Sequence, residues 1–154
     1  MPEETWFSQF LKLVPVISVL ATVTGWVVSS RFTSKNTGRH AKNAEINKLI
    51  DTLNKSLEDM FNEMTKVLSE DLDATKKTIA YHKFVGMVQN IKYICDGIEK
   101  LDSSQRIDPI KIVTLRQACT NERKYDPKKI HSSLPELQSI QEQIKRSYNK
   151  KFAI

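Results

Sequence analysis

The feature that most constrains this chain is an uncharged run of 18 residues, from Leu13 to Ser30, near its N-terminus. A helix needs about 20 predominantly apolar residues to cross the hydrocarbon core of a bilayer. Trp6 and Trp26 lie near the two ends of the run, where indole rings favour the membrane interface. The run therefore predicts a single transmembrane helix, which together with a short N-terminal tail makes up a domain 1–30.

Two other kinds of segment can resemble a transmembrane helix. A secretory signal peptide needs a basic stretch before its apolar region, but this chain begins MPEET, which is acidic. An interfacial amphipathic helix needs a charged face, and residues 13–30 contain no charged side chain. Both alternatives therefore fit the run less well than a membrane span does.

The flanking charges predict the orientation of the span. Only Lys12 precedes the run closely, whereas Arg31, Lys35, Arg39 and Lys42 follow it. Cytoplasmic flanks carry the excess of Lys and Arg. We therefore expect a single-pass protein of the inner (plasma) membrane with its N-terminus outside and its C-terminal domain in the cytoplasm.

Small and hydroxyl side chains recur along the run with spacings of four, three and four: Ser18, Thr22, Gly25 and Ser29. Such spacings place residues on one helix face. Small residues let two membrane helices approach closely, so the stripe predicts self-association, or a weakly polar lining in a ring of helices. Alternatively, the hydroxyls bond carbonyls of their own helix and have no further role.

Residues 31–45 are polar and basic and contain one glycine, which predicts a juxtamembrane linker or a frayed helical extension. The pattern then becomes heptad-like, with apolar residues alternately four and three apart: Ile46, Ile50, Leu53, Leu57, Met60, Met64 and Val67. The flanking positions lack paired charges, so a helix bundle is favoured over a two-stranded coiled coil. We expect this helix to cover residues 41–70.

Three further helices are predicted after this one. Residues 74–100 repeat the spacing of an apolar face, with Phe84, Val88, Ile91, Cys95 and Ile98. Asp108 before Pro109 is a good start for a helix over 109–123, with Ile110, Val113 and Cys119 expected to face inward. A fourth helix is expected to begin at Ser133 with Pro135 in its first turn, and to bury Leu137, Ile140, Ile144 and Tyr148. The predicted class is all-α, with a cytoplasmic helical domain 46–154.

Catalytic motifs are absent from the sequence. It contains no nucleophile elbow, phosphate-binding loop, zinc-protease motif or dinucleotide fingerprint. His40, His82 and His131 are widely separated, and the two cysteines have no metal-ligand spacing. We therefore expect neither an enzyme nor a metal or other cofactor.

Positive charge gathers in the second half of the chain. Residues 81–154 hold 14 basic and 8 acidic side chains. This balance favours an anionic partner, and copies brought together around one axis would strengthen such a site. The candidate ligand-binding residues are Arg116, Thr120, Arg123, Lys124, Lys128, Lys129, Lys145 and Arg146. Tyr125 and Tyr148 could stack on a base. Alternatively, the last cations only offset a helix dipole.

The layout resembles the small membrane effectors of prokaryotic antiviral defence, above all the short ancillary membrane proteins of type III CRISPR systems. The resemblance covers length and arrangement, and no motif is shared. It implies that a cytoplasmic domain binds a cyclic oligoadenylate and that an oligomeric membrane domain then disrupts the membrane.

Three functions follow as hypotheses. The first is a homo-oligomeric membrane effector that senses a cyclic oligonucleotide, with no duplex nucleic acid as partner. The second is a non-enzymatic membrane-anchored scaffold for a protein partner. The third is a phage-type lysis regulator of reversed topology, in which Cys95 and Cys119 could form a disulfide.

Overall fold

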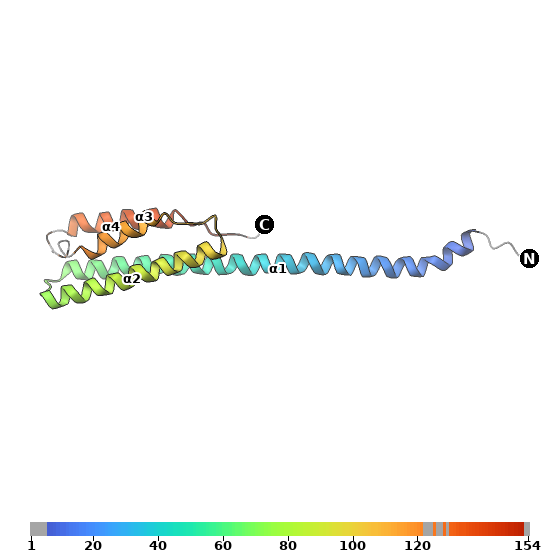
Figure 1. Ribbon diagram of the computed structural model, residues 1–154, viewed down its shortest axis with the longest axis horizontal. Helices are drawn as coiled ribbons and strands as arrows, with labels where there is room; N and C mark the ends of the chain where they lie inside the picture. Colours follow the sequence, from blue (N-terminus) through green and yellow to red (C-terminus); the bar gives the residue numbers. More distant parts are fainter. Residues whose placement is uncertain (1–5, 122–124, 126–127, 129, 153–154) are drawn as a thin grey trace, which may run out of the picture. The chain divides into compact units, whose positions relative to one another are not determined.

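Four helices follow one another along the chain in the computed structural model (Figure 1): α1 (Trp6–Ser69), α2 (Ala74–Leu101), α3 (Pro109–Thr120) and α4 (Ile130–Lys145). The structure describes residues 6–121, 125, 128 and 130–152, with the backbone alone for 6–17, 34, 35 and 130. These residues contain no strand, which confirms the predicted all-α class. The chain divides into two units, residues 1–41 and residues 42–154. We call the second unit the helical domain.

The first unit contains the N-terminal part of α1. Of the two alternatives for residues 31–45, linker or helical extension, the structure has the helix. This stretch lacks proline, contains only one glycine, and is rich in lysine, arginine and alanine, all of which favour a helix. The hydroxyl of Thr37 donates to the carbonyl of Thr33 at 2.8 Å, so this polar side chain is bonded within its own helix.

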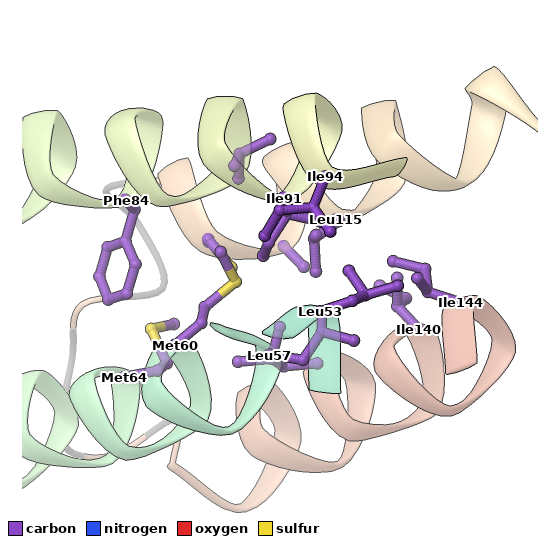
Figure 2. Packing of buried hydrophobic residues seen from close by; sticks show 14 of the residues in the cluster. Leu53, Leu57, Met60, Met64, Phe84, Ile91, Ile94, Leu115, Ile140 and Ile144 are labelled. Atoms are coloured by element: carbon purple, nitrogen blue, oxygen red, sulfur yellow. The ribbon is translucent and has the colours of Figure 1, made fainter. Parts of the chain in front are cut away.

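The heptad pattern marks the side of α1 that enters the core of the helical domain. All seven heptad positions are buried: Ile46, Ile50, Leu53, Leu57, Met60, Met64 and Val67. Figure 2 shows Leu53, Leu57 and Met60 facing the same interior as Ile140 and Ile144 of α4. The heptad helix therefore packs on helices of its own chain, and it ends at Ser69, within one residue of the predicted end.

α2 begins and faces inward as predicted. Asp73 is its N-cap, and the carboxylate accepts a hydrogen bond from the backbone N–H of Lys76 at 2.8 Å. The predicted apolar face is buried throughout: Phe84, Val88, Ile91, Cys95 and Ile98. The ring of Phe84 also packs against the ring of Tyr125, with centroids 6.0 Å apart.

α3 differs from the prediction in the side that it buries. Asp108 caps it as expected, accepting from the N–H of Ile110 at 2.9 Å. However, Ile110 is 69% exposed and Val113 is 53% exposed, so their predicted inward placement is wrong. The helix packs through Leu115, Ala118 and Cys119 instead. Apolar residues occur around most of this short helix, so their spacing alone did not mark the buried side.

α4 begins earlier than predicted. It starts at Ile130, so Ser133 lies inside the helix and is buried, and the prediction that Ser133 caps it is wrong. Pro135 also lies inside the helix rather than in its first turn. Because proline has no N–H, the carbonyl of His131 loses its usual partner there, a loss that a helix end tolerates best. The predicted apolar face is buried: Leu137, Ile140, Ile144 and Tyr148.

A buried hydrogen bond joins α4 to α1 across the core. The side-chain amide of Gln141 in α4 donates to the carbonyl of Leu57 in α1 at 2.8 Å. A second buried bond is local: the hydroxyl of Tyr125 donates to the carbonyl of Cys119, close to the C-terminal end of α3. A buried polar group is costly without a partner, so the first bond favours one register of α4 on α1, and the second holds Tyr125 at the end of α3.

The chain after α4 crosses back over α1 and α2. We call residues 146–152 the C-terminal strap. The side chain of Asn47 exchanges two hydrogen bonds of 2.8 Å with the backbone of Lys151, and the side chain of Gln105 accepts from the N–H of Asn149 at 2.7 Å. The ammonium of Lys151 lies 2.8 Å from the carboxylate of Asp102, at the end of α2. The strap thus ties the chain's end to both helices.

The strap should make stability depend on pH through Asp102. The ammonium of Lys151, and then Gln105 and Ser104, hold the pKa of this carboxyl well below its usual range. Because the pKa is lower in the folded state, the stabilisation is present above the ordinary value of about 4 and is lost as the pH falls below it. The free energy of unfolding measured from neutral to acidic pH should therefore fall less steeply for Asp102→Asn.

Asp59→Asn is the matched control for this prediction, since Asp59 is an exposed aspartate of α1 away from the strap. It should keep the acid sensitivity of the unsubstituted protein. Parallel pH profiles for the unsubstituted protein and Asp102→Asn would show that the strap ion pair does not contribute.

Candidate functional site

The predicted ligand-binding residues do not gather at one place within a chain. Arg116 lines a cavity between α2 and α3, Thr120 lines one with Glu136 of α4, and Lys145 lines a third beside α1. Lys128 and Arg146 are exposed, whereas Arg123, Lys124 and Lys129 lie outside the described residues. A single anion site built from the described members of this set would therefore need more than one copy of the chain.

The two tyrosines that could have stacked on a base belong to the core. Tyr125 is 2% exposed and Tyr148 is 6% exposed. Burial also raises the pKa of Tyr148 well above its usual range, so its hydroxyl stays protonated. Neither ring is available to a ligand at the surface, and the structure therefore overturns the expected stacking role.

The cavity beside Arg116, which we call the α2–α3 cavity, has a volume of about 400 Å³. Ligand sites typically have volumes of about 300–1,000 Å³ and mostly apolar walls. Seven of the lining residues are uncharged and five are charged: Val85, Val88, Gln89, Ile107, Pro109, Ile112 and Val113, with Lys92, Asp96, Glu99, Arg106 and Arg116. The cavity therefore combines an aliphatic surface with charged groups at its margins.

The charges of the α2–α3 cavity are only partly neutralised. The guanidinium of Arg106 lies 3.3 Å from the carboxylate of Glu99. Arg116 and Lys92 form no ion pair with any residue that the structure describes. Two cations thus remain available beside the aliphatic surface, against the single carboxylate of Asp96.

Of the charged residues that line this cavity, the sequence predicted a binding role only for Arg116. Lys92 lies beside the buried apolar face of α2, and Arg106 lies in the segment between α2 and α3, so neither belongs to the basic cluster of the predicted set. Val85, Lys92, Asp96 and Glu99 recur at helical spacing along a neighbouring side of α2, which was the available signal. That α3 would cover this side could not be read from α2 itself.

The apolar stretch of α1 is the second candidate site. Every side chain described from residue 18 to residue 33 is exposed. The large apolar ones among them are between 39% and 72% exposed: Val19, Leu20, Val23, Trp26, Val27, Val28 and Phe32. No described part of the first unit covers these side chains.

The small-residue stripe lies within this stretch. The hydroxyl of Thr22 donates to the carbonyl of Ser18 at 2.8 Å, as in the alternative interpretation of the stripe. A side chain added at Gly25 would meet nothing within 4 Å. The hydroxyl of Thr22 is therefore already bonded within its own helix, and any role of Thr22 and Gly25 depends on their small size.

Among the residues that the structure describes, no helix is long and apolar enough to cross a membrane. The predicted span begins at Leu13, and the side chains of residues 13–17 lie outside those described.

No cluster of three or more His, Cys, Asp or Glu side chains that could hold a metal ion occurs among the described residues. Cys95 and Cys119 are both buried free thiols. Burial raises the pKa of the Cys95 thiol, so this thiol stays protonated at neutral pH and is a poor nucleophile. The described part of the chain thus offers binding surfaces, and we identify no catalytic arrangement in it.

Comparison with protein-family models, with curated proteins and with solved structures found no match to the chain.

Proposed function

We propose that the protein is an oligomeric membrane-anchored effector. Residues 13–30 would embed in the bilayer, and the helical domain would sense an anionic ligand and alter the integrity of the membrane. The observation that carries this proposal is the apolar stretch of α1, where every described side chain from residue 18 to residue 33 is exposed.

Lipid is the partner that suits this stretch best. With 3.6 residues per turn, Val19, Leu20 and Val28 point to different sides of α1, and all three are exposed. A helix that is apolar on every side belongs in a membrane or in a large core, and large exposed apolar patches indicate such contacts. The side chains that the structure describes in the first unit form no core of their own, which favours the membrane.

The charges that follow the stretch support the predicted orientation. Arg31 and Arg39 are exposed on α1 just beyond Ser30, where cytoplasmic flanks carry positive charge. The helical domain would then lie on the cytoplasmic side of the inner membrane, where glutathione and thioredoxin keep thiols reduced. Its two free buried cysteines are compatible with that compartment.

Self-association would occur along the small-residue stripe. The open space around Gly25 would let the helix of a second copy approach closely, and close backbone approach is what stabilises helix pairs in lipid. Association would also bring basic residues of several helical domains together. A shared anion site needs this, because Arg116 and Lys145 line different cavities of one chain.

Dye release from vesicles that contain the full-length protein tests the effector function. A panel of cyclic and linear oligonucleotides, together with decanoate and decyl phosphate, should include one species that triggers release beyond that of protein-free vesicles. Gly25→Leu should abolish that release because the larger side chain separates the membrane helices. Gly38→Leu is the matched control, since Gly38 lies in the polar part of α1 and also faces open space. Absence of release with every ligand would refute the effector.

A membrane-anchored scaffold is the second candidate. It is favoured by the distribution of the predicted ligand-binding residues over three separate cavities of one chain. A scaffold should stay bound to the vesicles without releasing dye. The Gly25→Leu variant of a scaffold should bind the vesicles as well as the unsubstituted protein does.

A further inference from the structure

We infer that the α2–α3 cavity binds an amphipathic anion, a molecule with an aliphatic body and one carboxylate or phosphate head group. This inference deepens the proposed function, on which it rests for the consequence of binding, because it names the ligand class of the helical domain. The binding itself needs only the geometry of α2 and α3.

The aliphatic surface of the cavity lies where the two helices face each other. Val85 and Val88 come from α2, and Ile112 and Val113 come from α3. Their branched side chains offer apolar contact without a hydrogen-bonding group. At about 400 Å³, the space lies within the range of small-molecule sites, so it fits the body of a medium-sized apolar molecule.

The charges divide the cavity into two ends. Glu99 and Asp96 lie toward the C-terminal end of α2, and Lys92 lies seven residues before Glu99, about 10 Å along the helix. α3 follows α2 after a short loop and packs against it, so Arg116, seven residues beyond Pro109, lies away from Glu99. Arg116 and Lys92 therefore provide a cationic part distinct from Glu99, and Asp96 lies one helical turn from Lys92.

The pairing of the charges selects an anion as the head group. Arg106 is already paired with Glu99 at 3.3 Å, whereas Arg116 and Lys92 have no ion-pair partner among the described residues. A guanidinium binds carboxylate or phosphate through two parallel hydrogen bonds. The unpaired carboxylate of Asp96 repels additional negative charge, which favours one head group over a polyanion.

The lining also separates this ligand class from a nucleotide. No aromatic side chain lines the α2–α3 cavity among the residues described, whereas base recognition commonly uses aromatic stacking. The aliphatic walls instead match an alkyl chain. Decanoate and decyl phosphate are therefore suitable probes, and decanol is the uncharged control of the same chain length.

The test uses the full-length protein in nanodiscs of zwitterionic lipid, with methyl NMR signals of Val85, Ile112 and Val113 as the readout. Decanoate, decyl phosphate or both should shift these signals saturably, and the stronger of the two identifies the head group. Decanol enters lipid as well, but it should not saturate these signals. Equal shifts with decanol would overturn the inference.

Two substitutions and one control locate the head group. Arg116→Gln should weaken binding about tenfold or more, because it removes a charge-assisted hydrogen bond. Lys55→Gln, which removes an exposed cation of α1 that does not line the cavity, should leave binding unchanged. Unchanged affinity for Arg116→Gln would contradict the inference. Val113→Glu should also abolish binding, because the half-exposed position places a carboxylate one helical turn before Arg116.

The methyl signals in nanodiscs and the dye release from vesicles together separate this inference from the proposed function. Binding at the methyl signals without dye release from vesicles would leave the cavity assignment intact and refute the effector. If an oligonucleotide triggered release while decanoate and decyl phosphate left the methyl signals unchanged, the effector would be supported and the cavity assignment refuted.

Discussion

Phe84→Ala should lower the free energy of unfolding of the helical domain by about 3–5 kcal/mol, the usual effect of removing a buried aromatic side chain. Phe84 has no exposed surface, and its ring packs against Tyr125 with centroids 6.0 Å apart. Removing the ring would leave a cavity between α2 and α1, because Phe84 lies opposite Met60 and Met64 in Figure 2. Because domains are stable by only about 5–15 kcal/mol, this loss is large.

Denaturant unfolding followed by far-ultraviolet circular dichroism measures this change. A fragment of residues 42–154 is suitable, because every buried core residue lies between Ile46 and Tyr148. Ile79→Ala is the matched control in the same helix, since Ile79 is 62% exposed and should change the free energy of unfolding by about 0.5 kcal/mol or less. Equal effects of the two substitutions would contradict the described core.

Val23→Asp should remove most of the protein from lipid. Val23 lies near the middle of the uncharged run, and an aspartate at the centre of a membrane helix costs about 2.5–3.5 kcal/mol. This corresponds to roughly a hundredfold change in partitioning. Val19→Asp, one turn earlier on the same side of α1, should add to the effect. The protein's distribution in a vesicle flotation gradient measures the loss.

Thr37→Asp is the matched control for this loss. It introduces the same charge into the polar part of the same helix, where the side chain is already exposed. It should float like the unsubstituted protein. If Val23→Asp and Thr37→Asp floated equally well, the apolar stretch would not be the membrane contact.

The heptad of α1 and the apolar face of α2 could be predicted because long helices repeat their buried positions many times. Each such residue, from Ile46 to Val67, adds to one consistent pattern. The cap residue Asp108 could be assigned for a similar reason, since capping depends on a few neighbouring backbone groups.

The short helices could not be predicted to the same degree. α3 has 12 residues, and its side facing the core is decided by its packing against α2 and α4, which the apolar pattern of α3 alone does not contain. Ile110 and Val113 are apolar and still exposed for this reason. α4 begins before its proline, and Ser133, the predicted cap, is buried inside the helix.

The candidate site depended on contacts that sequence spacing does not contain. The predicted cationic set was chosen because its members are close in the sequence, but Arg116 and Lys145 line different cavities. Lys92 joins Arg116 only because α3 packs along α2. The contacts of the strap could not be predicted for the same reason, since Asn47 and Lys151 are 104 residues apart in the sequence.

Flotation of the unsubstituted full-length protein is the measurement that most directly tests the central claim, that residues 13–30 embed in lipid. The gradient should contain salt at about 1 M, where charges are screened beyond about 3 Å and purely electrostatic binding to headgroups is lost. The account predicts that the protein rises with the vesicles under these conditions. Protein that stays at the bottom of the gradient would contradict the membrane anchor, and with it the proposed effector.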